Sequence, residues 1–270
     1  MSSRRTLRVA IAGTAAVAAL CSLAAFSAPQ VANADKGSKG QSVTIYLTRH
    51  GETMLNTLDR VQGWSDSPLT EEGRETAENL GEGLAEAGIT FKSAYSADMV
   101  RHWETVSLAL GELEYKRDAV RDERLREIAF GRFEGAGNEE MWSEIATELG
   151  YADVGELFMD PEFDFNAALE SMVRLNEGSG LTAETPSQVA DRAVDALTDI
   201  AAERAKKGGG NVLVVSSGIT IMAALEALGG DLSGVEEGIE NGAVSELHYR
   251  NGTWTVRTVN DLSYVEAGQD

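Results

Sequence analysis

The sequence predicts an α/β fold in three layers, α/β/α, with a mostly parallel central sheet. Two short apolar runs, at 43–47 and 211–215, each lead into a polar turn and then a helical pattern. Apolar residues at helical spacing lie between these runs, and parallel strands need such helical crossovers. Near the C-terminus, Asn251-Gly252 is a strong hairpin signal, which adds antiparallel strands at one edge.

The first strand and its turn carry the main chemical signal. The run 43–47 is rich in β-branched and aromatic residues, Gly51 ends it, and a helical segment begins near Thr53. The carboxyl end of a strand is where open α/β sheets bind ligands, and a helix start aims N–H groups at an anion. His50 in this turn can attack an electrophile, and Arg49 can hold a phosphoryl group by two parallel hydrogen bonds.

The segments after this turn predict a loop, a helix and a second strand. We expect the loop 60–68 to lie over the site, and Thr70 to cap the helix that follows. That helix has its apolar residues at helical spacing: Ala77, Leu80, Leu84 and Ala87. A short strand is predicted at 92–95, and another helix begins at Asp98.

The C-terminal half predicts the second strand-turn-helix unit. Short amphipathic pieces occupy 138–184, and the capping box 185–188 then begins a long helix. The apolar run 211–215 predicts a central strand buried on both faces. It leads into the turn 216–218 and a helix at 219–228, so the turns after the two strands should meet.

The predicted hairpin at 251–252 sets the register of the last two strands. It pairs Tyr249 with Trp254 and Leu247 with Val256 on one face, and His248 with Thr255 on the other. His248 is therefore an ordinary strand residue, away from the chemistry.

The first residues predict an export signal. A basic start, an uncharged Ala-rich run at 9–26 and Ala32-Asn33-Ala34 are typical of a secretory signal peptide and its cleavage site. A membrane span is the weaker alternative, because small polar residues and the cleavage signal follow the run. The predicted organisation is a signal peptide at 1–34, a disordered lead-in at 35–42, and one domain at 43–270 with a helical insertion at about 138–184.

The net charge limits the classes of partner, and the cysteine content limits the disulfides that the chain can form. The net charge is −21 at pH 7, which disfavours nucleic acid and anionic lipid. An anionic substrate then needs a locally basic pocket, which Arg49, Arg60 and Arg101 would supply. The single cysteine, Cys21, lies inside the predicted signal peptide, so the exported chain can form no disulfide.

Four blocks that follow one another in order resemble the histidine phosphatase superfamily, in the branch of cofactor-dependent phosphoglycerate mutases and related small-substrate phosphatases. The blocks are LTRHGET at 47–53, the segment from Asn56 to Gly73 with Arg60-Val61-Gln62-Gly63-Trp64 and Ser67-Pro68-Leu69-Thr70, the segment 95–101, and the segment 125–135. The resemblance covers roughly the whole chain after the signal peptide. Members often carry a helical insertion that caps the site, so 138–184 is either such a lid or added core.

The resemblance implies a site and a reaction. His50 matches the histidine that attacks phosphorus and forms a phosphohistidine, which water then hydrolyses. Arg49, Arg60 and Arg101 match the arginines that bind the phosphoryl oxygens, and Glu127 matches the acid that protonates the leaving oxygen. The set needs no metal and no cofactor, and its partner would be a small phosphorylated substrate.

One member of this set is changed. The block after the central strand usually reads Ser-His-Gly in the family, whereas this chain has Ser216-Ser217-Gly218. Ser217 takes the histidine position with only one donor, and loss of one such donor typically slows a reaction by about a hundred- to a thousandfold. His102 is placed about 100° from Arg101 around their helix, which predicts that it points away from the site.

The sequence therefore predicts an exported phosphatase that works through His50. The alternative is an inactive pseudophosphatase that binds a phosphorylated ligand in the arginine pocket, which Ser217 suggests. A phosphoglycerate mutase is a weaker alternative, because the export signal separates the protein from the cytoplasmic substrate pool. The sequence does not predict an oligomeric state.

Overall fold

The computed structural model describes residues 41–235 and 238–269, and within them the fold is α/β around one central sheet. The predicted signal peptide at 1–34 lies outside the described residues, as does all but the end of the predicted lead-in at 35–42. None of the described helices is both long and apolar enough to cross a membrane.

Within the described residues, the strands form a sheet in the order β3-β2-β4-β1-β5-β6. They are β1 (Val43–Arg49), β2 (Phe91–Ser96), β3 (Val120–Arg121), β4 (Gly210–Ser216), β5 (Val244–Arg250) and β6 (Thr253–Asp261). The pairs β1/β4, β2/β4 and β2/β3 are parallel, whereas β5 is antiparallel to both β1 and β6. The sheet is therefore parallel through its centre and antiparallel at one edge, as predicted.

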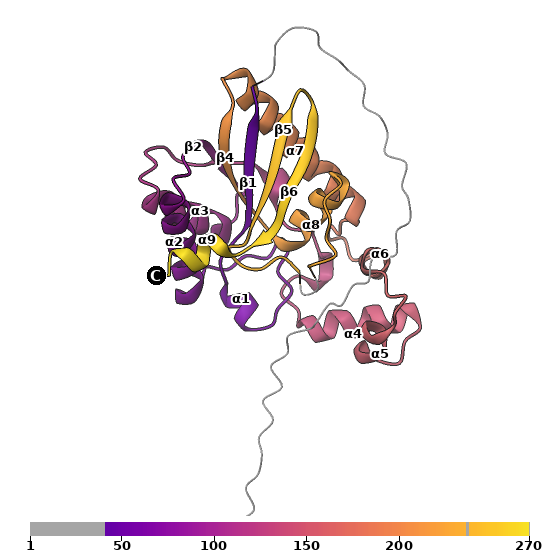
Figure 1. The fold of residues 1–270 in the computed structure, drawn as a ribbon. Coiled ribbons are helices and arrows are strands. Elements are labelled where there is room, and N and C mark those ends of the chain that lie inside the picture. Colours follow the sequence, from indigo (N-terminus) through magenta and orange to yellow (C-terminus); the bar gives the residue numbers. More distant parts are fainter. Residues whose placement is uncertain (1–40, 236–237, 270) are drawn as a thin grey trace, which may run out of the picture.

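Helices cover both faces of the sheet and complete the three layers (Figure 1). They are α1 (Met54–Thr57), α2 (Glu71–Glu86), α3 (Val100–Glu112), α4 (Asn138–Leu149), α5 (Val154–Met159), α6 (Phe165–Leu175), α7 (Pro186–Lys206), α8 (Gly218–Ala227) and α9 (Ser263–Ala267). Apolar side chains of α7 and α8 pack on one face of the sheet. Those of α2, α3 and α9 pack on the other, so each face has its own hydrophobic core.

The local signals in the sequence place most of these elements. Thr70 accepts a hydrogen bond from Gly73 N at the start of α2, and Thr185 forms a capping box at the start of α7. The hairpin between β5 and β6 has the predicted register, including the pair His248 and Thr255. Asn251 has a φ of 53° there, a left-handed conformation that asparagine tolerates well.

The insertion forms a third hydrophobic cluster with the site's own loops. Helices α4, α5 and α6 lie together at the end of the molecule that α1 also occupies (Figure 1). Their buried residues, such as Ile145 and Leu169, share one cluster with Val61, Ile128 and Phe133. The insertion therefore adds core beneath the loops at the carboxyl end of the sheet, while its predicted capping role stays a prediction.

Candidate active site

The carboxyl ends of β1 and β4 lie side by side, so the two predicted turns meet. Arg49 is the register partner of Ser216, and His50 N donates a hydrogen bond to Ser216 O at 3.0 Å. The polar side chains of both turns consequently converge at one edge of the sheet, where open α/β folds bind ligands.

Two hydrogen bonds and one close packing contact hold the turn that carries His50. Gly51 N donates to Thr105 Oγ1 at 3.0 Å, and Asn241 Nδ2 donates to His50 O at 2.6 Å. A Cβ on Gly51 would lie 2.2 Å from Gly73 O, so the first turn of α2 presses directly on this backbone. Only glycine fits at position 51, and the imidazole of His50 is held in one place.

The His50 ring is arranged as a neutral nucleophile. It is 4% exposed, and its Nδ1–H donates to Gly51 O at 2.8 Å, which leaves the lone pair on Nε2. Burial lowers the pKa of His50 well below its ordinary value, and the positive charges of Arg101 and Arg49 lower it further. His50 therefore stays unprotonated at mildly acidic as well as neutral pH.

Arg49 and Arg101 each keep a buried N–H group available. Arg49 donates through Nη1 to Ile239 O at 2.6 Å, and its Nε is buried with no partner among the described residues. Arg101 is fully buried, and its Nε likewise finds no partner in this part of the chain. Burial lowers the pKa of both arginines, and the negative charge of Glu127 works against this in each case. Two cationic side chains near a nucleophile, each with an Nε–H group that no described residue accepts, form a site suited to an anion.

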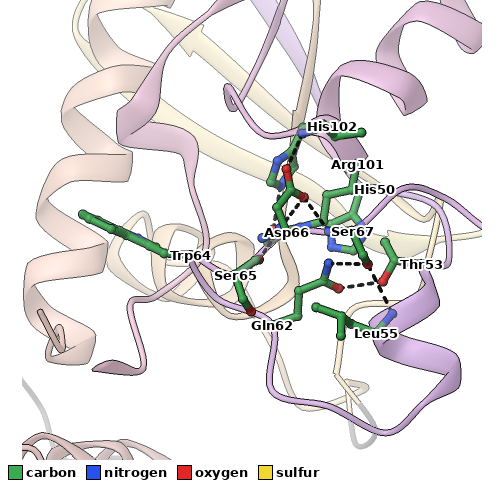
Figure 2. Close-up of polar contacts among 12 residues, drawn as sticks. His50, Thr53, Leu55, Gln62, Trp64, Ser65, Asp66, Ser67, Arg101 and His102 are labelled. Atoms are coloured by element: carbon green, nitrogen blue, oxygen red, sulfur yellow. Dashed lines mark hydrogen bonds and ion pairs between the residues drawn. The ribbon is translucent and has the colours of Figure 1, made fainter. Parts of the chain in front are cut away.

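The loop at 60–68 lies across the Arg101 guanidinium, as predicted (Figure 2). Arg101 donates to Gly63 O at 2.7 Å, to Ser65 O at 3.0 Å and to Asp66 Oδ1 at 3.1 Å. Asp66 also accepts from Val100 N at the start of α3, at 2.6 Å. The loop and the helix that bears Arg101 are thereby joined.

Glu134 fixes the same loop from the opposite side, a role that the sequence patterns do not reveal. Its carboxylate accepts from the backbone N–H groups of Gly63, Trp64 and Ser65, at 3.1, 2.7 and 2.7 Å. A carboxylate that binds three successive N–H groups holds a loop as firmly as a short piece of regular structure. Trp64 then donates through Nε1 to Glu127 O, which links this loop to the segment that carries the predicted acid.

Arg60 lies outside the cluster around His50. Its side chain is exposed, and it lines a cavity of about 490 Å³ with Asp59, Glu139 and Glu140 among others. Its backbone pairs with Gly137, next to α4. The structure brings together the other predicted residues and leaves Arg60 at the boundary with the insertion.

Glu127 sits against the first turn of α8, close to Ser217. It is 7% exposed, and its two oxygens accept from Ile219 N at 3.0 Å and from Thr220 N at 2.9 Å. These are backbone donors at a helix start, where a negative charge is favoured. The carboxyl group therefore has a fixed position within range of both arginines, where its negative charge partly offsets the lowering of their pKa by burial.

Arg192 of α7 holds the backbone of the segment that carries Glu127. It donates to the carbonyl oxygens of Arg124, Arg126 and Glu127, at 2.8, 2.7 and 2.9 Å. It also forms a two-point ion pair with Glu184, through Nε and Nη2. No sequence pattern predicts this contact, because Arg192 lies on a helix far along the chain from Glu127.

His102 lies in the site, which contradicts the prediction that it points away. Its Nε2 is 2.7 Å from Ser217 Oγ, and its ring is edge-to-face with that of His50, with 5.2 Å between ring centroids. The prediction was wrong because the first turn of α3 meets the site end-on. The long Arg101 side chain reaches sideways to the loop, while the shorter His102 reaches Ser217 directly.

The assembled groups suit the transfer of a phosphoryl group to a histidine. A neutral imidazole can supply the electron pair, two buried guanidinium groups lie close enough to lower its pKa, and the Glu127 carboxyl group lies within electrostatic range of both guanidinium groups. Within residues 41–235 and 238–269, no three His, Cys, Asp or Glu side chains are grouped as a metal site requires.

Comparison with known proteins decides the family. The model of the histidine phosphatase superfamily, branch 1, matches residues 45–262. The chain belongs to this superfamily. Its similarity to a crystal structure of phosphoglycerate mutase from Bacillus anthracis has a TM-score of 0.78 at 37% identity, and covers 86% of this chain and 99% of the other.

Other similar proteins carry the names of mutases and of a phosphatase. A probable phosphoglycerate mutase, GpmB, of Shigella dysenteriae is 28% identical over 83% of this chain and 95% of its own length. A 2,3-bisphosphoglycerate-dependent phosphoglycerate mutase of Hydrogenobaculum is 34% identical over 99 residues, which span 40% of its length. A phosphoserine phosphatase from Entamoeba histolytica shares the fold, with a TM-score of 0.58 at 19% identity over 82% of this chain and 98% of the other.

Proposed function

We propose that this chain is a phosphatase that hydrolyses a small phosphomonoester through a phosphohistidine on His50. In the first step, Nε2 of His50 forms a bond to phosphorus, the ester P–O bond breaks, and protonated Glu127 gives its proton to the leaving oxygen. In the second step, water attacks phosphorus, the N–P bond breaks, and the water proton returns to Glu127. Inorganic phosphate then leaves, and His50 and Glu127 return to their starting states.

The observation that carries the proposal is the pairing of a neutral nucleophile with unused cationic donors. The lone pair of His50 is free because Nδ1 is committed to Gly51 O. The Nε–H groups of Arg49 and Arg101 are buried without acceptors among the described residues. Burying such groups without a partner is costly, so their retention is best explained by an anionic ligand that satisfies them.

Mutase activity is a second candidate, because the relatives in Bacillus anthracis and Shigella dysenteriae carry the name phosphoglycerate mutase. The two reactions share the phosphohistidine and differ in the second acceptor. A phosphatase delivers the phosphoryl group to water, whereas a mutase returns it to another hydroxyl of the substrate. The cavity that Arg60 lines also carries Asp59, Glu139 and Glu140, so this surface bears more negative than positive charge and would disfavour a multiply anionic phosphoglycerate.

The test is phosphate release from a panel that contains an aryl phosphate, phosphoserine, 3-phosphoglycerate and 2,3-bisphosphoglycerate. We expect hydrolysis of at least one of them. It should persist below about pH 6.5, where an ordinary histidine would be protonated, because the pKa of His50 is lowered. Interconversion of 3- and 2-phosphoglycerate without phosphate release, followed by ³¹P NMR, would instead establish the mutase.

A further inference from the structure

The hydroxyl group of Ser217 does not cap the helix that follows it, although a serine at this position usually does. Ser217 is the N-cap of α8, where a serine side chain normally accepts a hydrogen bond from the helix backbone. Its Oγ makes no such bond. Glu127 already accepts from the N–H groups of Ile219 and Thr220, so α8 is capped without Ser217.

The partner of this hydroxyl group is His102, and the chemistry of the ring indicates which atom donates. His102 is fully buried, and its Nδ1 has no partner among the described residues. A buried N–H without an acceptor is rarer than an unused lone pair, so the ring proton belongs on Nε2. Nε2–H then donates to Ser217 Oγ across 2.7 Å, and the hydroxyl proton of Ser217 is left for another acceptor.

Ser217 lies in the turn next to that of His50, and His102 contacts both residues. Figure 2 shows His102 next to His50 and Arg101. Ser217 directly follows Ser216, whose carbonyl oxygen accepts from His50 N at 3.0 Å. A phosphoryl group on its way to Nε2 of His50 would therefore pass within reach of the Ser217 hydroxyl group.

We propose that His102 and Ser217 act as a pair that supplies a hydrogen-bond donor to the transferring phosphoryl group. Ser217 touches a phosphoryl oxygen, and His102 is a positioning residue that holds and polarises the Ser217 hydroxyl group. Chains of hydrogen bonds strengthen one another in a dry site. The pair would thus compensate, from helix α3, for the histidine that the family resemblance implies at position 217. The proposal rests on the phosphatase function proposed above.

The geometry gives the proposal an unusual consequence for Ser217→His. A histidine at 217 would project toward the ring of His102, whose Nε2 already lies 2.7 Å from the serine oxygen. Two imidazoles would compete for one buried volume, so the single substitution should lower activity. The double variant Ser217→His with His102→Ala vacates that volume and should recover activity, because the imidazole then comes from position 217 instead.

The experiment compares steady-state kinetics of the full chain and its variants on an aryl phosphate. Ser217→Ala should lower kcat by about a hundred- to a thousandfold, as loss of one transition-state donor does. His102→Phe keeps a ring beside His50 but has no nitrogen, and should lower kcat at least about tenfold while KM changes little. His102→Gln, which keeps a donor near the Nε2 position, should be more active than His102→Phe. His248→Phe on β5, outside the site, serves as the matched control and should match the parent.

Two results would overturn the proposal. One is a His102→Phe variant with the kcat of the parent. The other is a Ser217→His variant that is more active than the parent and gains nothing from His102→Ala. Thermal unfolding of every variant separates a loss of fold from a loss of the donor, because a variant that loses only the donor keeps the unfolding temperature of the parent.

A parent without turnover on any substrate would count against the proposed function and not by itself against the pair. Binding of orthovanadate, which resembles the five-coordinate transition state, then decides the matter. Its vanadium-bound oxygens stand in for the oxygens of the transferring phosphoryl group. If the pair donates to these oxygens, the parent should bind orthovanadate at least about tenfold more tightly than His102→Phe. Equal binding by the two proteins would reject the pair.

Discussion

Replacement of His50 by alanine should abolish phosphate release, with kcat reduced by at least about a thousandfold. The reason is that His50 Nε2 is the atom that forms the bond to phosphorus, and neighbouring groups can stabilise charge but cannot take over this bond. His102, though 5.2 Å away between ring centroids, directs its Nε2 to Ser217 and not to the attack position. The measurement is phosphate release by the parent and the variant, on the best substrate of the panel.

The control for this prediction is His248→Ala, which makes the same substitution on β5, away from the site. Its activity should equal that of the parent. If His50→Ala kept a tenth or more of the parent activity while its unfolding temperature was unchanged, the nucleophile would have to be another group.

Glu127→Gln should affect substrates unequally, according to how much their leaving oxygen needs a proton. The leaving group of an aryl phosphate is a stabilised phenolate, which can depart with little protonation. The leaving group of an alkyl phosphate such as phosphoserine is a basic alkoxide, which needs the proton. General acid catalysis typically contributes about a hundred- to ten-thousandfold, so the ratio of alkyl to aryl rates should fall by at least about a hundredfold. The measurement is kcat/KM for both substrates with parent and variant.

The comparison of two substrates removes a structural complication. Glu127 accepts hydrogen bonds from Ile219 N and Thr220 N. Glutamine at 127 would direct its amide N–H₂ group at one of these donors. Such a mismatch costs about 1 to 3 kcal/mol of folding free energy. A damaged site would slow both substrates by the same factor. Equal losses for phosphoserine and the aryl phosphate would thus show that Glu127 only caps α8 and is not the acid.

The fold was predictable where local sequence determines local structure. The first strand, the central strand at 210–216, the capping box at Thr185 and the hairpin at 251–252 follow from side-chain periodicity and from turn residues with special backbone conformations. In contrast, β3 and α9 gave no such signal. β3 is two exposed residues, and α9 depends on a long-range contact in which Gly83 leaves room for Tyr264 O.

The sequence names most residues of the candidate cluster but not how they are arranged. The resemblance named His50, Arg49, Arg101 and Glu127, and the structure brings them together at the ends of β1 and β4. Arg60, predicted to bind the phosphoryl group, lies instead beside the insertion, because loop 60–68 turns its backbone toward Gly137. A motif identifies residue types, while the path of a loop decides which of them meet.

His102 shows why side-chain positions escape a helical projection. Such a projection gives the angle between two residues around an axis, and here it placed His102 on another face from Arg101. It does not say whether the site lies beside the helix or at its end. Because α3 points its first turn at the site, residues separated by 100° both reach it, one through its length and one by proximity.

The most direct test of the central claim is a search for phosphohistidine on His50. The parent would be mixed with substrate, quenched in alkali within one turnover and digested, and its peptides analysed by mass spectrometry. We predict a phosphoryl group on the peptide that contains His50, stable in alkali and lost in acid, and absent from the His50→Ala protein. Phosphate release without any such adduct, or an adduct on His102 or Ser217 instead, would contradict the account.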